Sequence, residues 1–266
     1  MSNTKNISID TEYLKVMSVG PSGEGKSIFA ASFPTPGFLF DFGDEALSYR
    51  GKDFDYESYS LSPLGWAKYE KDFITLKKCL IEGIRFPQEG ESTQAKERYQ
   101  TVAVDNVTAM TSLCMERALQ LDPKRSETGG PIWNVHYPLV KNLMEGRLRQ
   151  LIDLPANVIL IAHMDVDKDK EGAVIGVGPM LTGQLSVTIP SYFQEVYYHS
   201  HRKEGNDTRW VMQTIPIGMN HGRSRLSGKE RLLPDLIEND YRVLAEYITG
   251  ARKKVQQTKP QPTQTK

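Results

Sequence analysis

The segment from Gly20 to Ser27 carries residue types that bind a phosphate chain, since it reads Gly-Pro-Ser-Gly-Glu-Gly-Lys-Ser. In a phosphate-binding loop, glycines let main-chain N–H groups turn toward an anion, the lysine reaches the β- and γ-phosphates, and the serine hydroxyl binds Mg²⁺. A plain glycine-rich turn would not need Lys-Ser after its last glycine. The expected ligands are ATP and Mg²⁺, and the predicted binding residues are Gly20, Pro21, Ser22, Gly23, Glu24, Gly25, Lys26 and Ser27.

Asp105 supplies the carboxylate that a Mg²⁺ site beside this loop requires. It ends the apolar run Thr101-Val-Ala-Val, which is typical of a buried strand. The carboxyl ends of parallel strands meet at one edge of a sheet, so we expect Asp105 and Ser27 to share the metal. In the alternative interpretation, Asp105 is the N-cap of a helix that begins at Val107, a role for which Asn106 and Thr108 compete.

Hydrolysis also needs a group that orients or deprotonates water. Three acids, Asp41, Asp44 and Glu45, follow a short apolar segment; Glu45 is the first candidate and Asp44 the second, with a solvated acidic turn as the alternative. His163 ends another apolar run. It is a candidate sensor of the γ-phosphate or, equally, a half-buried residue at a strand end.

Two arginines, Arg223 and Arg225, are spaced by one residue late in the chain. On an extended segment, their side chains would point the same way. They fit a finger that reaches a neighbouring subunit's nucleotide, a contact with DNA phosphates, or a solvated edge. His199 and His201 would share one face of a strand, but without a third ligand they indicate an exposed face rather than a metal site.

The elements that must position these residues follow an α/β pattern. Buried apolar strands separated by helices indicate a mostly parallel sheet flanked by helices, here a P-loop NTPase core with a C-terminal β-hairpin extension. Strands are predicted at 13–19, 37–41, 101–105 and 157–163, a hairpin at 194–199 and 208–214, and helices from 28 and at 73–84, 107–121, 136–154 and 239–248. Residues 122–135 and 164–180 are predicted as loops.

The composition fits one domain, because the chain has 266 residues and is 39% hydrophobic. We expect a flexible N-terminus at 1–11, an ATPase domain at 12–250 and a disordered tail at 251–266. Lys+Arg and Asp+Glu both number 33, which argues against a globally basic nucleic-acid binder. With only Cys79 and Cys114, no zinc site or disulfide framework follows. No apolar run approaches the ~20 residues of a membrane span, so a cytoplasmic protein without membrane contact is expected.

The order of these parts resembles the RecA-like core ATPases encoded by phages, in particular the ATP-dependent Sak-type single-strand annealing recombinases. The resemblance covers roughly residues 12–248. It rests on six features in order, namely 20–27, the acidic turn 41–45, 101–105 followed by Asn106-Val-Thr108, Ala162-His163, 178–183, and Gly222-Arg-Ser-Arg225 before Leu232-Leu-Pro234.

The resemblance implies ATP hydrolysis coupled to binding of single-stranded DNA, with strand annealing or exchange in phage recombination. It also implies a homo-oligomeric ring or filament with ATP at subunit interfaces, and a single-strand-binding protein is a candidate partner. The two predicted loops would face DNA, with Lys124, Arg125 and Trp133 on the first and Lys168 and Lys170 on the second. Four acids on the second loop depart from a DNA-binding composition.

Two other function classes stay open from the sequence. A small-molecule kinase uses the same phosphate loop but needs an acceptor pocket and usually an arginine-rich lid. A nucleotide-gated binding module would bind ATP without a competent water-activating acid. Replacing Glu45 separates the ATPase from this module.

Overall fold

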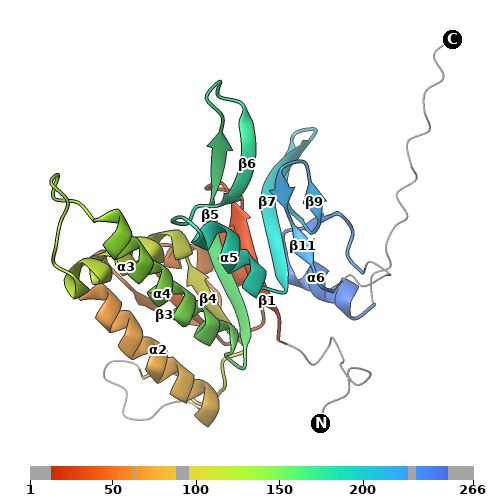
Figure 1. Cartoon of the computed structure of the whole chain (residues 1–266). Coiled ribbons are helices and arrows are strands. Elements are labelled where there is room, and N and C mark those ends of the chain that lie inside the picture. The colour runs from red at the N-terminus through yellow and green to blue at the C-terminus, as the bar shows by residue number, and fades with distance from the viewer. Residues whose placement is uncertain (1–12, 63, 88–95, 227–231, 251–266) are drawn as a thin grey trace, which may run out of the picture.

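The computed structural model describes residues 13–62, 64–87, 96–226 and 232–250, and within them the main sheet has ten strands. Eight run in the order β12-β8-β7-β1-β5-β4-β2-β3, and β6 and β11 pair with β5 and β7 (Figure 1). The predicted flexible N-terminus at 1–11 and tail at 251–266 lie outside the described residues.

Six parallel strands form the centre of this sheet. They are β1 (Lys15–Gly20), β2 (Gly37–Asp41), β3 (Phe54–Ser58), β4 (Thr101–Asp105), β5 (Asn157–Lys168) and β7 (Glu195–Glu204). The first, second and fourth are buried along their whole length, as continuous apolar segments require in a sheet covered on both faces. The predicted α/β fold with a mostly parallel sheet is confirmed.

Helices cover both faces of the sheet (Figure 1). One hydrophobic cluster joins the sheet to α2 (Gly65–Glu82), α3 (Val107–Leu121), α4 (Trp133–Ile152) and α5 (Leu185–Tyr192). The second cluster, on the other face, joins it to α1 (Lys26–Ala31), the 3₁₀ helix η3 (Ala46–Tyr49) and α6 (Tyr241–Ile248). Helix α2 begins eight residues before its predicted start and α4 three residues before.

The prediction of a loop at 164–180 is wrong. Strand β5 continues to Lys168 and pairs antiparallel with β6 (Val174–Pro179), and this hairpin projects beyond the sheet (Figure 1). Met164 and Val166 alternate with the exposed Asp165 and Asp167, which is the period-two pattern of a strand. The charged residues of this segment made it look like a loop in the sequence. A strand that extends beyond the hydrophobic core does not need a continuous apolar run, so the part of β5 after His163 can be charged.

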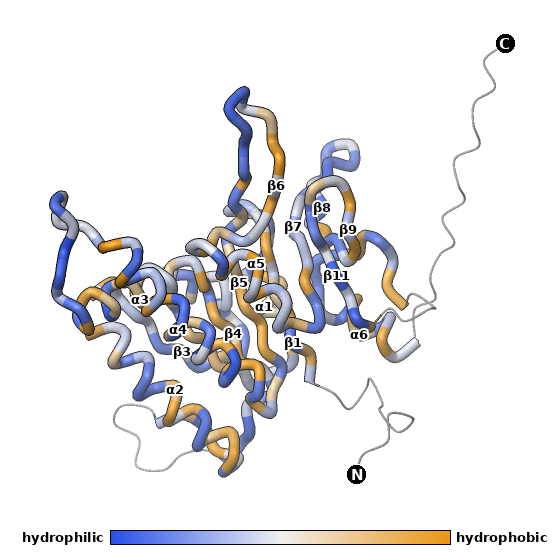
Figure 2. Tube along the Cα trace, viewed as in Figure 1, coloured by the Kyte–Doolittle hydropathy of each residue, from blue (hydrophilic) through white to orange (hydrophobic). Residues whose placement is uncertain are grey.

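The predicted hairpin near the C-terminus is present as β7 and β8 (Asp207–Gln213). Strand β7 also pairs in parallel with β1, so the hairpin widens the same sheet. The chain then forms β9 (Pro216–Ile217), β10 (Asn220–His221), β11 (Arg223–Ser224) and β12 (Leu236–Glu238), the last pairing with β8. Figure 2 shows hydrophilic residues at the tips of both long hairpins and hydrophobic residues in the central strands.

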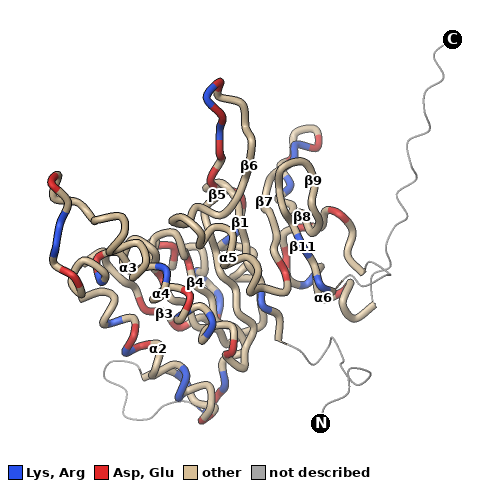
Figure 3. The backbone as a smooth tube through the Cα atoms, in the orientation of Figure 1, with Lys and Arg blue, Asp and Glu red and all other residues tan. Residues whose placement is uncertain are grey.

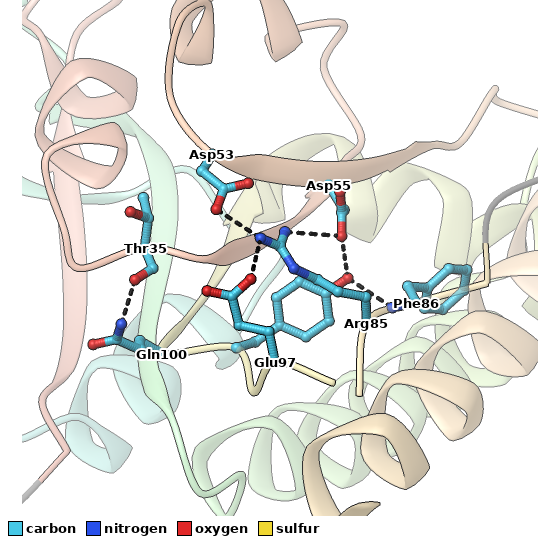
Figure 4. A network of polar contacts seen from close by, with 8 residues as sticks. Thr35, Asp53, Asp55, Arg85, Phe86, Glu97 and Gln100 are labelled. Atoms are coloured by element: carbon cyan, nitrogen blue, oxygen red, sulfur yellow. Dashed lines mark hydrogen bonds and ion pairs between the residues drawn. The ribbon is translucent and has the colours of Figure 1, made fainter. Parts of the chain in front are cut away.

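A polar network holds the edge strand β3, which has no partner on its outer side among the described strands. The Arg85 guanidinium contacts Asp53 at 2.6 Å, Glu97 at 3.0 Å and Asp55 at 3.2 Å (Figure 4). The Tyr99 hydroxyl also donates to Asp55. These contacts tie β3 to the segment that leads into β4.

Candidate nucleotide site

The phosphate loop lies between β1 and α1, at the mouth of a cavity of about 710 Å³. Gly23 and Gly25 have φ angles of 81° and 78°, which side chains rarely tolerate. Gly20 has a different reason, because a Cβ there would lie 2.9 Å from the carbonyl oxygen of His199 on the adjacent β7. The phosphate end of the cavity is lined by Ser22, Gly23, Gly25, Lys26, Ser27, Glu45, Asp105 and His163.

Lys26 is buried and donates to the carbonyl of Pro21 at 2.6 Å. Burial lowers the pKa of its ammonium group, and the carboxylates of Asp105 and Glu45 partly oppose this change. The ammonium group is therefore held inside the loop, where a phosphate can replace the carbonyl as its partner.

Asp105 is 1% exposed at the end of β4, one strand away from β1 across β5. Burial raises the pKa of its carboxyl to about 7, while hydrogen bonds from Ser27 and Tyr49 act in the opposite direction. The N-cap of α3, the alternative role considered for Asp105, is Asn106, whose side-chain oxygen accepts from Ala109 N at 2.8 Å. Asp105 is thus left to face the loop.

A hydroxyl from Ser27 and a carboxylate from Asp105 are the hard oxygen donors that Mg²⁺ prefers. The described part of the chain holds no cluster of three or more His, Cys, Asp or Glu side chains suited to a metal. This donor set fits an ion that takes its remaining ligands from phosphate and water.

Glu45 lines the cavity, whereas Asp44 is exposed and does not line it. Asp41 is buried and accepts from Glu45 N at 2.9 Å and from the Ser58 hydroxyl at 3.2 Å. Asp41 therefore supports the turn that places Glu45. Of the three acids, Glu45 is the one that lines the cavity.

His163 also lines the cavity and lies beside Gly20 in the β1–β5 register. Its Nε2 is 3.3 Å from Nδ2 of Asn106. Because Asn106 uses its oxygen to cap α3, its amide is the donor here, and the imidazole proton resides on Nδ1. Burial and the nearby Lys26 lower the pKa of His163, so a neutral imidazole faces the phosphate end.

Arg223 and Arg225 differ in their exposure and in their contacts. The Arg223 guanidinium donates to the carbonyls of Pro190 at 2.6 Å and Phe193 at 2.8 Å, which binds it to the end of α5. The Arg225 side chain is exposed. Strand β11 pairs with the start of β7. Both arginines therefore lie at the amino-terminal end of β7, whereas the phosphate loop follows the carboxyl end of the adjacent strand β1.

The histidine pair does not form an exposed face either. His199 is 2% exposed and contacts Oδ1 of Asn239 at 2.8 Å. His201 contacts the carboxylate of Glu24 in the phosphate loop at 2.9 Å. Both side chains are engaged with the nucleotide site, which the sequence did not indicate.

The outer part of the cavity was missed by the sequence analysis. It is lined by Ile28, Thr208, Arg209, Trp210, Glu238, Asn239 and Asp240. Most of these residues belong to β8 or follow β12, and no motif marks them. The only available signal was Asp240, the N-cap of α6.

The five residues predicted to contact DNA do not line this cavity. Lys124 and Arg125 are exposed in the α3–α4 connection, Trp133 is exposed at the start of α4, and Lys168 and Lys170 are exposed at the end of β5 and in the turn before β6. Figure 3 shows charged residues along this connection and at the end of the β5–β6 hairpin. The Trp133 ring packs against Tyr137 at 4.3 Å between centroids. Arg125 donates to three nearby carbonyls, including that of Leu119 at 3.2 Å, so its guanidinium is partly used within the chain.

Known structures and one protein family are similar to this chain. Comparison with curated proteins gives no match. Among solved structures, the chain is similar to a KaiC-like protein from Pyrococcus horikoshii, with 10% identity and a TM-score of 0.43 over 85% of this chain and 88% of that one. It is also similar to the flagellar accessory protein FlaH from Methanocaldococcus jannaschii, with 12% identity and a TM-score of 0.30 over 75% and 76%.

In the described residues, no helix is long and apolar enough to cross a membrane. The family described as AAA domain matches residues 12–226, which include the phosphate loop, Glu45, Asp105 and His163. The chain therefore belongs to the AAA domain family, and its nucleotide site is that of a P-loop ATPase.

Proposed function

We propose that this protein is a RecA-like enzyme that hydrolyses ATP, binds single-stranded DNA and promotes strand annealing or exchange in phage recombination. The observation that carries hydrolysis is the convergence of Lys26, Ser27, Asp105 and Glu45 on one cavity. A nucleotide-binding module without catalysis would not need a carboxylate beside the phosphates, held in place by a second buried acid.

Each residue at the phosphate end of the cavity has a separate role in the proposed transfer of the γ-phosphoryl group to water. The loop N–H groups and Lys26 would bind the phosphates, and Ser27 and Asp105 would hold Mg²⁺, which would supply positive charge to neutralise the phosphate oxygens. Glu45 accepts a proton from the attacking water. The neutral His163 hydrogen-bonds the γ-phosphate and reports its presence along β5 to the β5–β6 hairpin.

Binding of single strands is supported by the α3–α4 connection. Trp133 is 68% exposed, and its ring lies against Tyr137. Lys124 is exposed on the same connection. An exposed tryptophan ring offers a face on which a base can stack, and a cation on the same connection can neutralise phosphate. We place the first DNA contact here, in an active form that is a ring or filament of identical subunits.

The test is ATP hydrolysis with and without single-stranded DNA, with Lys26→Ala as the inactive reference. We expect single strands to stimulate turnover and Trp133→Ala to weaken DNA binding by about 1–3 kcal/mol, the usual worth of one stacked base. Tyr56→Ala is the matched control, because Tyr56 is also exposed but lies on the edge strand β3. An ATP hydrolysis rate that is the same with and without single-stranded DNA would reject the proposal and favour a small-molecule kinase.

The β5–β6 hairpin favours a second candidate, a nucleotide-gated module that binds a protein partner. Its acids outnumber its bases, because Asp165, Asp167, Asp169 and Glu171 face only Lys168 and Lys170. Such a surface repels DNA phosphates and suits a basic protein. Retained partner binding together with absent turnover would support this candidate.

A further inference from the structure

Consecutive residues of the phosphate loop are held by distant parts of the chain. The Trp210 indole on β8 donates from Nε1 to the carbonyl of Gly23 at 3.2 Å. The next residue, Glu24, contacts His201 of β7 at 2.9 Å. The loop is thus fastened to the β7–β8 hairpin at two successive positions.

Asn239 makes a third contact, because its Nδ2 donates to the carbonyl of Gly25 at 2.7 Å. The fit is close, since a Cβ on Gly25 would lie 2.5 Å from that nitrogen. The Oδ1 of Asn239 accepts from Nδ1 of His199 at 2.8 Å. His199 therefore fixes which way the Asn239 amide faces.

Buried His199 keeps one protonation state. It is 2% exposed, and burial lowers its pKa to about 3, so the ring is neutral at physiological pH. With Asn239 Oδ1 as the acceptor, the single ring proton resides on Nδ1. We call these two hydrogen bonds the relay: His199 donates to Asn239, and Asn239 donates to the carbonyl of Gly25.

Holding these carbonyls orients the donors that a phosphate meets. A trans peptide is planar, so its N–H points opposite to its carbonyl. The contact to the Gly23 carbonyl therefore sets the direction of the Glu24 N–H. The Gly25 carbonyl also accepts from Phe29 N at 2.9 Å in the first turn of α1, so the contact from Asn239 is a second restraint on the direction of the Lys26 N–H.

We infer that Asn239, His199 and Trp210 are positioning residues, which preset the main-chain N–H groups of the phosphate loop for a nucleoside diphosphate or triphosphate. The inference rests on the nucleotide site of the proposed function but needs neither hydrolysis nor DNA. It assigns to the β7–β8 hairpin and the residue after β12 a part in phosphate binding that the loop sequence does not reveal.

The experiment is titration of the full-length chain with ADP, with urea unfolding of each variant alongside. Asn239→Ala is expected to weaken ADP binding about tenfold, the effect of one lost hydrogen bond near 1.4 kcal/mol. The matched control is Asn157→Ala. Asn157 is buried and bonds Leu14 and Gln100, but it lies at the amino-terminal edge of the parallel strands, away from the phosphate loop. Its loss should lower stability and leave ADP affinity unchanged.

Two further variants test the relay. His199→Phe removes the donor and should weaken ADP binding nearly as much as Asn239→Ala, with no added loss in the double variant. His199→Asn returns an amide donor near the Nδ1 position and should restore affinity. Additive losses, or no rescue by His199→Asn, would overturn the relay.

Trp210→Phe provides an independent test if Asn239→Ala does not fold. It replaces the indole by a smaller aromatic ring without the N–H on a half-exposed side chain, and it should weaken ADP binding a few-fold. ADP affinity within twofold of wild type in Asn239→Ala, or in Trp210→Phe where the first does not fold, would overturn the inference. A wild-type chain that fails to bind ADP would instead refute the nucleotide site itself.

Discussion

The hydroxyl of Tyr49 donates to Oδ2 of Asp105 at 3.3 Å. This bond links η3, which follows Glu45, to the carboxylate at the end of β4. Burial raises the pKa of Asp105, and the bond from Tyr49 limits that rise. The turn that carries the proposed water-activating acid thus also tunes the proposed metal ligand.

Tyr49→Phe should therefore move the pH dependence of Mg²⁺–ADP binding to higher pH. Without the hydroxyl, the carboxyl of Asp105 holds its proton more tightly, and a metal must displace that proton. The measurement is ADP affinity with Mg²⁺ between pH 6 and 8. Tyr197→Phe, which removes a buried hydroxyl bonded to Glu195, is the control and should leave the profile in place.

Ionisation of Asp105 should cost the nucleotide-free protein stability as pH rises from about 4 to about 7. The pKa of Asp105 is raised from 3.8 to about 7 on folding, so the folded state binds the proton more tightly and ionisation costs stability. Asp105→Asn removes this cost and should raise stability above pH 7 by a few kcal/mol, at about 1.4 kcal/mol per pKa unit. Identical pH slopes in thermal unfolding of both proteins would contradict the assignment.

Glu45→Gln should abolish ATP turnover while leaving ATP affinity within about threefold of wild type. The amide keeps the size of the side chain but cannot accept a proton from water, and a loss of about 10²–10⁴ in rate is usual for such a group. Steady-state hydrolysis and nucleotide titration measure the two quantities. Asp44→Asn is the control, because Asp44 is exposed outside the cavity, and it should retain activity.

Arg225→Ala and Arg223→Ala should separate function from stability. The exposed Arg225 is available to a neighbouring subunit, so its loss should reduce turnover of the assembled protein without changing unfolding. Arg223 bonds two carbonyls near α5, so its loss should cost about 1–3 kcal/mol in urea unfolding. Equal turnover in Arg225→Ala and wild type would remove this residue from a role between subunits.

The sequence was sufficient for the buried part of the sheet and the phosphate end of the site. Strands 101–105 and 37–41 are continuous apolar runs because both their faces are covered, and each run leads to a polar residue at the nucleotide edge. Strand β3 was missed because Phe54–Ser58 is a half-exposed edge strand of mixed composition. Helix α5 was missed because Pro190 lies inside it.

Two features of the site could not be predicted from the sequence, namely the outer part of the cavity and the contacts that hold the phosphate loop. His199 and Asn239 acquire their roles only when β7 pairs beside β1 and β12 beside β8. A strand pattern specifies that a residue lies on a face, but not which distant loop that face meets. Arg223 and Arg225 are a similar case. The sequence shows their spacing, but it does not show that Arg223 donates to the carbonyls of Pro190 and Phe193.

The contact between Asn239 and Gly25 also sets the order in which the site is completed during synthesis. The two residues are separated by 214 positions, so the phosphate loop leaves the ribosome long before the side chain that holds its carbonyl. A nascent chain that ends at residue 226 contains the whole family match but not this anchor. With Asn239 as a positioning residue, as we infer, nucleotide binding at full strength is expected only after this residue has been synthesised and β12 has joined the sheet.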